Sequence, residues 1–271
     1  NNFLSPLFPA GFYYKTFMWP ASFWEKYEYF IRHSAGLGKS PMLKDPDIYD
    51  HRNIHCDVLV VGAGISGILA AKNAAKNNYK TLLLDEKNEL GGSTIYENIE
   101  SSKIDNKISS KWLKNEIEEL KNIKNLEIKT RTSVAAYHQY NYLLARESLT
   151  DHLEKKDKTN KIRQRLLKIR AKKVILATGA LERPMVFNNN DRPGIMLSSA
   201  IKKYSDFYGV ACGRKIVFFT NNDSAYESAL SLNDKGIKVE AIVDIRKQSK
   251  TNLEKRVIDA GVKICWEHTV A

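Results

Sequence analysis

The sequence predicts an α/β protein of the Rossmann type, with two dinucleotide-binding-type units of which the second is truncated at its C-terminus. Residues 57–86 run from an apolar strand through a glycine motif and a helix to a second strand that ends in acids. Residues 173–180 form another apolar strand, and residues 215–246 repeat the layout of the first unit. Apolar strands that alternate with helices are typical of a parallel sheet covered on both faces.

The glycine motif carries the functional prediction. It follows the strand 57–61 in the spacing G-x-G-x-x-G and opens a helix expected over 65–78. The first glycine permits a tight turn, the second lets the backbone approach a pyrophosphate, and the third lets helix and strand pack closely. Free N–H groups at the helix start attract phosphates. We therefore expect a dinucleotide at Gly62, Ala63, Gly64, Ile65, Ser66 and Gly67.

The acids after the second strand refine this prediction. Asp85 follows the strand 81–84, lies 18 residues after Gly67 and precedes Glu86. A carboxylate there can accept hydrogen bonds from the ribose hydroxyls and disfavours a 2′-phosphate, so we expect NAD or FAD rather than NADP. The motif does not distinguish between these two. The alternative is a Rossmann unit that has lost its ligand and serves only as a scaffold.

Two other segments are candidates for contact with the cofactor. Gly91 and Gly92 follow the acids, and the pair either marks a turn or approaches the far side of the dinucleotide, which we favour here. Thr178 and Gly179 end the strand 173–180. In flavoproteins with two dinucleotide domains, such a strand returns to the first sheet and its glycine passes close to the cofactor.

Between these segments the sequence predicts regular structure of both kinds. Residues 45–53 have the composition of a polar connector, and residues 126–132, 133–138 and 142–146 are expected to form short strands, as a meander across the Rossmann sheet. One amphipathic helix presents an apolar face made of Trp112, Leu113, Ile117, Leu120 and Ile123. Arg183 and Arg192 lie in a connector broken by Pro and Gly, and they are either anion contacts or surface arginines.

The second unit lacks the glycines of the first. T-N-N-D-S-A (220–225) stands in place of the motif, and Asp244 lies 19 residues after Ala225. The side chains of Thr220 and Asn222 obstruct the path that a pyrophosphate would take. Because Asn tolerates a left-handed backbone, the turn can survive while the site is lost. We expect no ordinary dinucleotide binding here.

Composition excludes several classes of protein. Among the 271 residues, 43% of them hydrophobic, no apolar run approaches the ~18 needed to cross a membrane. The net charge of +12 is spread along the chain, which favours a solvated basic surface over a nucleic-acid site. The cysteines Cys56, Cys212 and Cys265 are isolated and form no C-x-x-C pair, which fits a reducing cytoplasm.

Residues 1–50 form an aromatic-rich arm that differs from the rest of the chain. Residues 3–30 contain 12 of the 27 aromatic side chains, and a short helix is expected over 22–31. So many rings must be buried, either on the protein's own domain or against another subunit. We expect the first dinucleotide-binding domain over 51–205 and a partial second domain, with the degenerate motif, over 206–271.

Five stretches together resemble the alpha subunits of heterotetrameric sarcosine oxidases. They are GFYYKTFMWP (11–20), AGLGKSP (35–41), DVLVVGAGISG (57–67), VILATGALERPMVFNNNDRPGIM (174–196) and FFTNNDSAYESAL (218–230). The resemblance covers nearly the whole chain. It implies a glutathione-reductase-like two-domain module whose first unit holds NAD+, preceded by a ferredoxin-like domain and followed by a folate-binding domain.

The resemblance also implies partners and an activity. A flavin-bearing beta subunit carries FAD, smaller subunits complete the hetero-oligomer, and FMN lies near the alpha–beta interface. The complete enzyme demethylates sarcosine to glycine, makes hydrogen peroxide and passes the one-carbon unit to tetrahydrofolate. Because this chain has no recognisable general base, nucleophile or metal cluster, we expect no catalytic residue in it. The alternatives are a subunit of an FAD-dependent amine, opine or imino acid dehydrogenase, and a non-catalytic NAD-binding scaffold subunit.

Overall fold

The fold is described from a computed structural model. The described residues are 19–38, 42–96, 103–154 and 161–270. The chain divides into a small unit, Asn1–Asp47, and a large unit, Ile48–Ala271.

The described part of the small unit is mainly one helix. A 3-10 turn, η2 (Ala21–Phe23), leads into α2 (Trp24–Ser34), which confirms the helix predicted near this position. Several aromatic rings in the described part of the small unit are exposed, among them Trp19 at 81% and Phe30 at 69%. Residues 1–18 and 39–41 lie outside the described residues. The first 18 residues of the predicted aromatic arm, most of the motif 11–20 and the last three residues of the motif 35–41 are therefore not part of this description.

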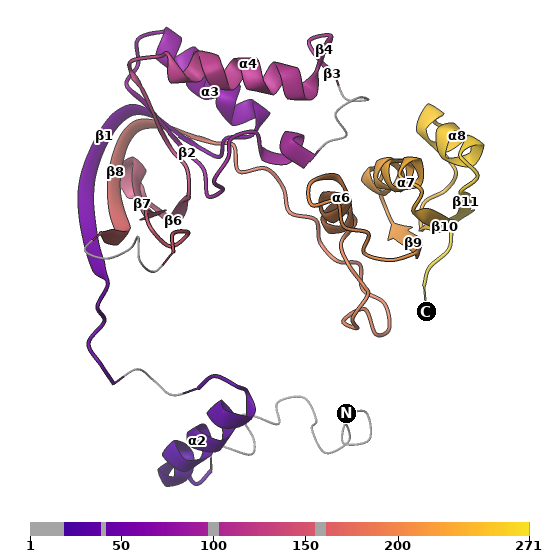
Figure 1. Ribbon diagram of the computed structural model, residues 1–271, viewed down its shortest axis with the longest axis horizontal. Helices are drawn as coiled ribbons and strands as arrows, with labels where there is room; N and C mark the ends of the chain where they lie inside the picture. Colours follow the sequence, from indigo (N-terminus) through magenta and orange to yellow (C-terminus); the bar gives the residue numbers. More distant parts are fainter. Residues whose placement is uncertain (1–18, 39–41, 97–102, 155–160, 271) are drawn as a thin grey trace. The chain divides into compact units, whose positions relative to one another are not determined.

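A six-stranded sheet organises the first part of the large unit. Its strand order is β5-β2-β1-β8-β7-β6 (Figure 1). The first four of these strands are parallel. β7 pairs antiparallel with β8, and β6 pairs antiparallel with β7. The strands are β1 (Ile48–Val61), β2 (Thr81–Leu84), β5 (Leu126–Lys129), β6 (Thr132–His138), β7 (Tyr142–Ser148) and β8 (Ile162–Leu176).

Three expectations for this sheet were wrong in detail. The predicted polar connector 45–53 is mostly strand, because β1 begins at Ile48 and pairs with β8 along its length. β8 likewise begins at Ile162 and ends before Thr178. The first half of β1 is largely exposed, so it lacks the continuous apolar run that identifies a buried strand. The third error is β5, which joins the parallel edge instead of the meander.

Both faces of β1 are buried near its carboxyl end. Val58 and Val60 pack with α3 (Ile65–Lys76) and α4 (Ser109–Lys121), which lie side by side in Figure 1. Leu59 and Val61 pack on the opposite face with residues of β2, β7 and β8. Burial on both sides fixes the direction of β1 and therefore the position of the turn that follows it. Trp112, Leu113 and Leu120 of the predicted apolar helix face are buried in the same core.

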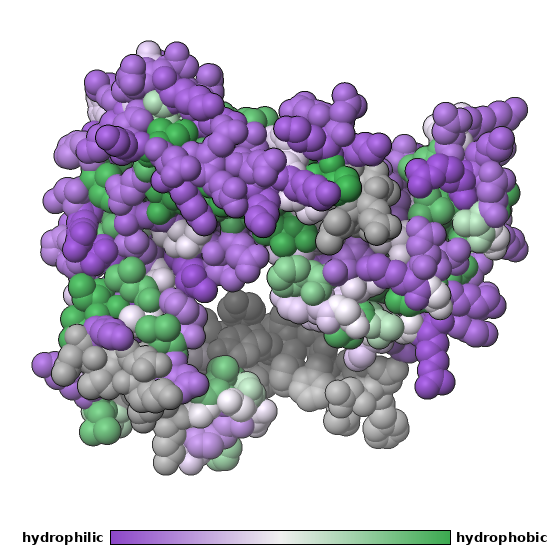
Figure 2. Space-filling view, turned by 45° about the horizontal axis from the view of Figure 1, so that its top comes forward, coloured by the Kyte–Doolittle hydropathy of each residue, from purple (hydrophilic) through white to green (hydrophobic). Residues whose placement is uncertain are grey.

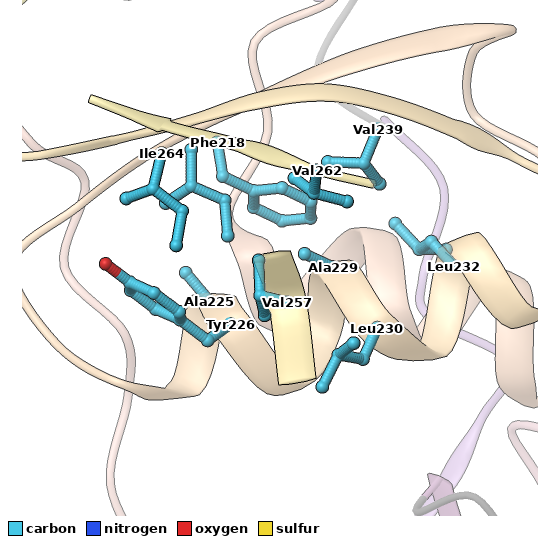
Figure 3. Close-up of a cluster of buried hydrophobic side chains, with 11 residues drawn as sticks. Phe218, Ala225, Tyr226, Ala229, Leu230, Leu232, Val239, Val257, Val262 and Ile264 are labelled. Carbon is cyan, nitrogen blue, oxygen red and sulfur yellow. The ribbon is translucent and has the colours of Figure 1, made fainter. Parts of the chain in front are cut away.

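The second part of the large unit is a smaller α/β layer. Its parallel strands have the order β11-β10-β9, and its helices pack one apolar cluster against them (Figure 3). Tyr226 lies in this cluster, 1% exposed. The elements are α6 (Ser198–Asp206), β9 (Lys215–Thr220), α7 (Ser224–Asp234), β10 (Lys238–Asp244), α8 (Asn252–Asp259) and β11 (Lys263–Trp266).

Four short elements complete the described fold: η3 (Gly92–Tyr96), η4 (Gln139–Asn141) and the paired β3 (Lys103–Ile104) and β4 (Lys107–Ile108). Hydrophilic side chains cover most of the face drawn in Figure 2, as expected for a sequence with 27% charged residues. No helix of the described residues has the length and apolar character needed to span a bilayer.

Candidate dinucleotide-binding site

Two glycines of the turn between β1 and α3 are required by the fold itself. Gly62 has a φ of +99°, which other residues rarely adopt, and a Cβ added to it would lie 2.2 Å from the carbonyl oxygen of Ala177. A Cβ added to Gly67 would lie 1.8 Å from the carbonyl oxygen of Gly62. Neither clash can be relieved by rotating a side chain, because both involve backbone atoms.

Gly64 differs, since neither its backbone nor its packing demands glycine. Its φ of −71° suits any residue, and the nearest atom to an added Cβ is the Cα of Gly92 at 4.0 Å, an ordinary contact. The protein therefore leaves open the space that a side chain would fill. A pyrophosphate that approaches the backbone would need this space.

The start of α3 offers hydrogen-bond donors at the same place. Gly64 is the N-cap, and no side chain of the described residues caps the helix there. The first N–H groups of a helix have no acceptor within the helix, and they lie at the positive end of its dipole. Ile65 is half-buried and Ser66 is exposed. The turn can thus hold phosphate oxygens through its backbone.

Asp85 lies directly against this turn. The residue is 9% exposed, and its Oδ2 accepts a hydrogen bond from the backbone N–H of Ala63 at 2.6 Å. Its Oδ1 accepts one from the N–H of Lys87 at 2.8 Å. Each carboxylate oxygen has a second lone pair, so both can still accept from a ribose hydroxyl. Glu86, the other predicted acid, is exposed.

The loop with Gly91 and Gly92 forms the neighbouring wall. The N–H of Gly91 donates to the carbonyl oxygen of Ala63 at 2.7 Å. Gly92 has a φ of +61°, and a Cβ added to it would lie 2.9 Å from the Cα of Gly64. The structure therefore brings both predicted glycines to the turn.

Thr94 is a residue that the sequence pattern did not indicate. It is 4% exposed, and its Oγ1 has no hydrogen-bond partner among the described residues. It lies in η3, two residues after Gly92. Burial of a hydroxyl without a partner costs free energy, so a ligand at the turn is a candidate partner for this group. In the sequence, the one feature that could have indicated Thr94 is its position directly after G-G-S (91–93).

The end of β8 reaches the turn through Ala177, another residue that the pattern missed. The N–H of Ala177 donates to the carbonyl oxygen of Val61 at 2.8 Å, and the Cα of Thr178 would lie 3.2 Å from a Cβ on Gly62. Thr178 is therefore next to the turn. Gly179 is exposed, with a φ of +72° and no atom within 4 Å of an added Cβ, so the protein's own packing does not occupy its surroundings.

The corresponding turn of the second unit is closed by its own side chains. Oδ1 of Asn222 accepts hydrogen bonds from the N–H and the hydroxyl of Ser224, at 3.0 and 2.6 Å. The N–H of Asn222 in turn donates to Oγ1 of Thr220 at 3.1 Å. The start of α7 thus already has an acceptor, which a phosphate would have to displace.

We expect no second dinucleotide to bind at residues 220–225. Titration of the full protein, with its first site loaded, should detect no further saturable binding of NAD(H) or NADP(H). A second stoichiometric site that Asn222→Lys removes would contradict this expectation.

Asp244, the acid of the second unit, is also occupied. It is 1% exposed and accepts hydrogen bonds from the hydroxyl of Tyr226 at 2.9 Å and from Nη2 of Arg246 at 2.8 Å. The same Nη2 lies 2.8 Å from Oδ1 of Asp223 in the turn. Burial alone raises the pKa of Asp244, but the hydrogen bonds from Arg246 and Tyr226 outweigh it, so the net pKa is below its ordinary value.

This pairing predicts a stability that depends on pH. Arg246→Ala should lower the free energy of unfolding by about 1–2 kcal/mol at pH 7, since the guanidinium is 38% exposed and partly screened. Because the folded pKa of Asp244 is lowered, its contribution is present above about pH 4 and is lost as the pH falls through the folded pKa. Urea unfolding at several pH values measures this, with Arg256→Ala, on the exposed side of α8, as the control. A gap between wild type and Arg246→Ala that stays constant below pH 4 would contradict the assignment.

The fold and the turn define a nucleotide-dependent oxidoreductase module. Residues 56–271 match the family model for pyridine nucleotide-disulphide oxidoreductases, and the chain belongs to this family. The predicted α/β fold class is thereby confirmed.

The particular relatives are sarcosine oxidase alpha subunits, which confirms the resemblance found in the sequence. The chain is 40% identical to sarcosine oxidase subunit alpha of Rhizobium meliloti (strain 1021), over 97% of this chain and 27% of that protein. It is also 40% identical to the subunit alpha of Corynebacterium sp. (strain U-96), over 88% of this chain and 24% of that protein. The chain therefore spans about a quarter of the length of these relatives. Both the family match and the sarcosine oxidase relatives support the prediction of an oxidoreductase subunit.

Solved structures of two oxidoreductases share the fold. L-proline dehydrogenase from P. horikoshii matches with a TM-score of 0.58 and 28% identity, over 75% of this chain and 38% of that one. Thioredoxin reductase from T. acidophilum matches with a TM-score of 0.53 and 19% identity, over 78% of this chain and 64% of that one. The second likeness concerns the fold alone.

No group of three or more His, Cys, Asp or Glu side chains among the described residues could hold a metal ion. The site near α3 presents backbone donors, glycines, the buried carboxylate of Asp85 and the buried hydroxyl of Thr94. These groups can bind and orient a dinucleotide.

Proposed function

We propose that the turn between β1 and α3 binds NAD+. The observation that carries the proposal is Gly64, whose missing side chain is explained neither by backbone conformation nor by packing. A pyrophosphate over Gly64 and the start of α3 supplies the explanation. The residues that would hold the cofactor are Gly62, Ala63, Gly64, Ile65, Ser66, Gly67, Asp85, Glu86, Gly91, Gly92, Thr178 and Gly179, to which we add Thr94.

Asp85 supports a dinucleotide without a 2′-phosphate. The carboxylate is buried against the turn, and a phosphate beside it would meet a like charge. FAD in the same turn is the alternative, because its adenosine half has the same ribose and pyrophosphate. When bound, NAD+ can accept a hydride, but this chain places no group for substrate chemistry beside the turn among its described residues.

We infer further that the chain is part of a sarcosine oxidase alpha subunit. The whole complex would demethylate sarcosine to glycine, make hydrogen peroxide and transfer the one-carbon unit to tetrahydrofolate. A flavin-bearing beta subunit and smaller subunits would be the partners, with FMN near the interface. Identity of 40% over 97% of the chain supports this inference. Within the chain we assign 1–50 to an arm, 51–205 to the nucleotide domain and 206–271 to a second Rossmann-like domain. The isolated cysteines favour a cytoplasmic location.

The test of the cofactor is the nucleotide that purified protein releases when it is denatured. We expect one equivalent of a compound with the mass and ultraviolet absorbance of NAD+, and no 2′-phosphate. Release of a yellow compound with the mass of FAD would favour the alternative, an FAD-dependent amine, opine or imino acid dehydrogenase subunit. Release of NADP would contradict the role given to Asp85.

A second measurement distinguishes a non-catalytic scaffold from a subunit whose nucleotide takes part in turnover. It records both the assembly and the activity of variants that no longer bind the nucleotide. If the nucleotide only stabilises the assembly, loss of binding should dissociate the subunits. If it takes part in turnover, variants without it should assemble and lose activity.

A further inference from the structure

A cavity of about 340 Å³ lies beside the dinucleotide turn, and the exposed Glu86 is the one residue that its lining shares with the proposed cofactor site. It is bounded by the loop after β2, the end of η3, Arg131 and the last residues around α6. None of the turn glycines lines it, nor does Asp85. Its volume is at the small end of the range for ligand pockets, which suits a ligand with one ring.

Three aromatic rings form one side of this cavity. The rings of Tyr96 and Phe207 meet edge to face with their centroids 5.1 Å apart, and those of Phe207 and Tyr208 meet likewise at 4.9 Å. Phe207 and Tyr208 remain 44% and 56% exposed. Exposed rings that hold one another in fixed positions offer a surface on which a flat ligand can pack.

Three cations line the same cavity. The ammonium of Lys203 lies 4.6 Å and that of Lys87 5.1 Å from the ring centre of Tyr96, and Arg131 completes the set. Among the described residues, no carboxylate forms an ion pair with any of the three. Lys202, one position before Lys203, instead donates to Asp206 at 2.8 Å. The acids at the cavity, Glu86 and Glu89, are exposed and leave an excess of one positive charge.

The backbone of Arg131 adds an independent observation. Its φ is +51°, in the left-handed region that arginine seldom adopts. Its N–H donates to the carbonyl oxygen of Lys87 at 2.8 Å, and its carbonyl oxygen accepts from the N–H of Ser148 at 2.9 Å. These bonds hold a strained residue at the cavity, and such strain is concentrated at sites that bind ligands.

The geometry points to a second binding site, for a small aromatic anion such as a monocyclic phosphate. The ring of the ligand packs on Tyr96, Phe207 and Tyr208. Its phosphate accepts hydrogen bonds from Lys87, Arg131 and Lys203, which offsets the repulsion between three cations that form no ion pair with a carboxylate among the described residues. This site does not depend on the identity of the dinucleotide.

Phenyl phosphate is the probe, titrated calorimetrically into the full protein with its nucleotide bound. We expect saturable binding, at least fivefold tighter than that of inorganic phosphate because of the ring. Lys203→Gln should weaken it about tenfold, through the loss of one charged hydrogen bond. The control Lys255→Gln, which removes an exposed lysine of α8, should leave it unchanged. Phe207→Leu should reduce the preference for phenyl phosphate over inorganic phosphate.

Three results of the titrations would overturn the proposal. They are the absence of saturable binding, equal affinity in wild type and Lys203→Gln, and equal affinity for phenyl phosphate and inorganic phosphate. Displacement of phenyl phosphate from nucleotide-free protein by added dinucleotide would also overturn it, because the cavity would then belong to the first site. Circular dichroism and melting of each variant distinguish a lost site from a lost fold.

Discussion

Gly64→Val should abolish dinucleotide binding while the protein stays folded. The valine Cβ would occupy the space over Gly64 that the protein leaves open, and its methyl groups would meet the pyrophosphate. The backbone at this position, with φ −71° and ψ −176°, is extended and accepts a β-branched residue. We expect at least a 100-fold loss of affinity, about 3 kcal/mol. The measurement is the nucleotide content of the purified protein, followed by titration of the nucleotide-free form.

A matched control is available in the same chain. Gly213 also has an ordinary φ, and an added Cβ would find its nearest neighbour, the carbonyl oxygen of Lys215, at 3.7 Å. Gly213→Val should therefore keep the nucleotide. Gly64→Ala, with a smaller side chain, should give an intermediate loss. Stoichiometric nucleotide in Gly64→Val would mean that the cofactor does not lie over this turn.

The first Rossmann turn could be predicted because its determinants are local. Strand β2 lies at the predicted residues 81–84, and α3 begins at the predicted residue Ile65. Glycine spacing, a small-residue helix and a terminal acid all lie within thirty residues and agree with one another. The position of Asp85 against Ala63 follows from the parallel pairing of β1 and β2.

The first half of β1 could not be recognised in the same way. It contains four consecutive polar residues, 50–53, and therefore no continuous apolar run, and its partner on β8 lies more than a hundred positions away. A strand of this kind is held by its neighbour in the sheet, and pairing between distant segments leaves no local pattern.

Both the sequence and the folded structure were needed to recognise that the second turn is closed. Missing glycines at 220 and 222 indicated that the pyrophosphate path is blocked. The link from Arg246 to Asp223 and Asp244 joins the turn after β9 to the end of β10, and only the folded structure brings these segments together. Similarly, Lys203 lies more than a hundred positions from Lys87, so no sequence pattern could place both at Tyr96.

The purified subunit that carries this chain should not oxidise sarcosine by itself. Removal of a hydride from an N-methyl amine needs a flavin beside a shaped pocket, while the protein supplies orientation and electrostatics. Among the described residues, the candidate site holds backbone donors, glycines and one buried acid, and no side chains are arranged for metal chemistry. The nucleotide turn is therefore suited to holding a cofactor rather than to shaping a substrate pocket.

The measurement compares hydrogen peroxide production from sarcosine by this subunit, by the partner subunits and by the reconstituted complex. We expect no turnover from the subunit alone, with or without added FAD, and full turnover only from the complex. The control is Gly213→Val in the complex, which should stay active because its substitution lies away from the turn. Turnover by the subunit with FAD as its sole addition would move the active site into it. That result would favour an FAD-dependent amine dehydrogenase, because the flavin would then have to occupy the turn at Gly64.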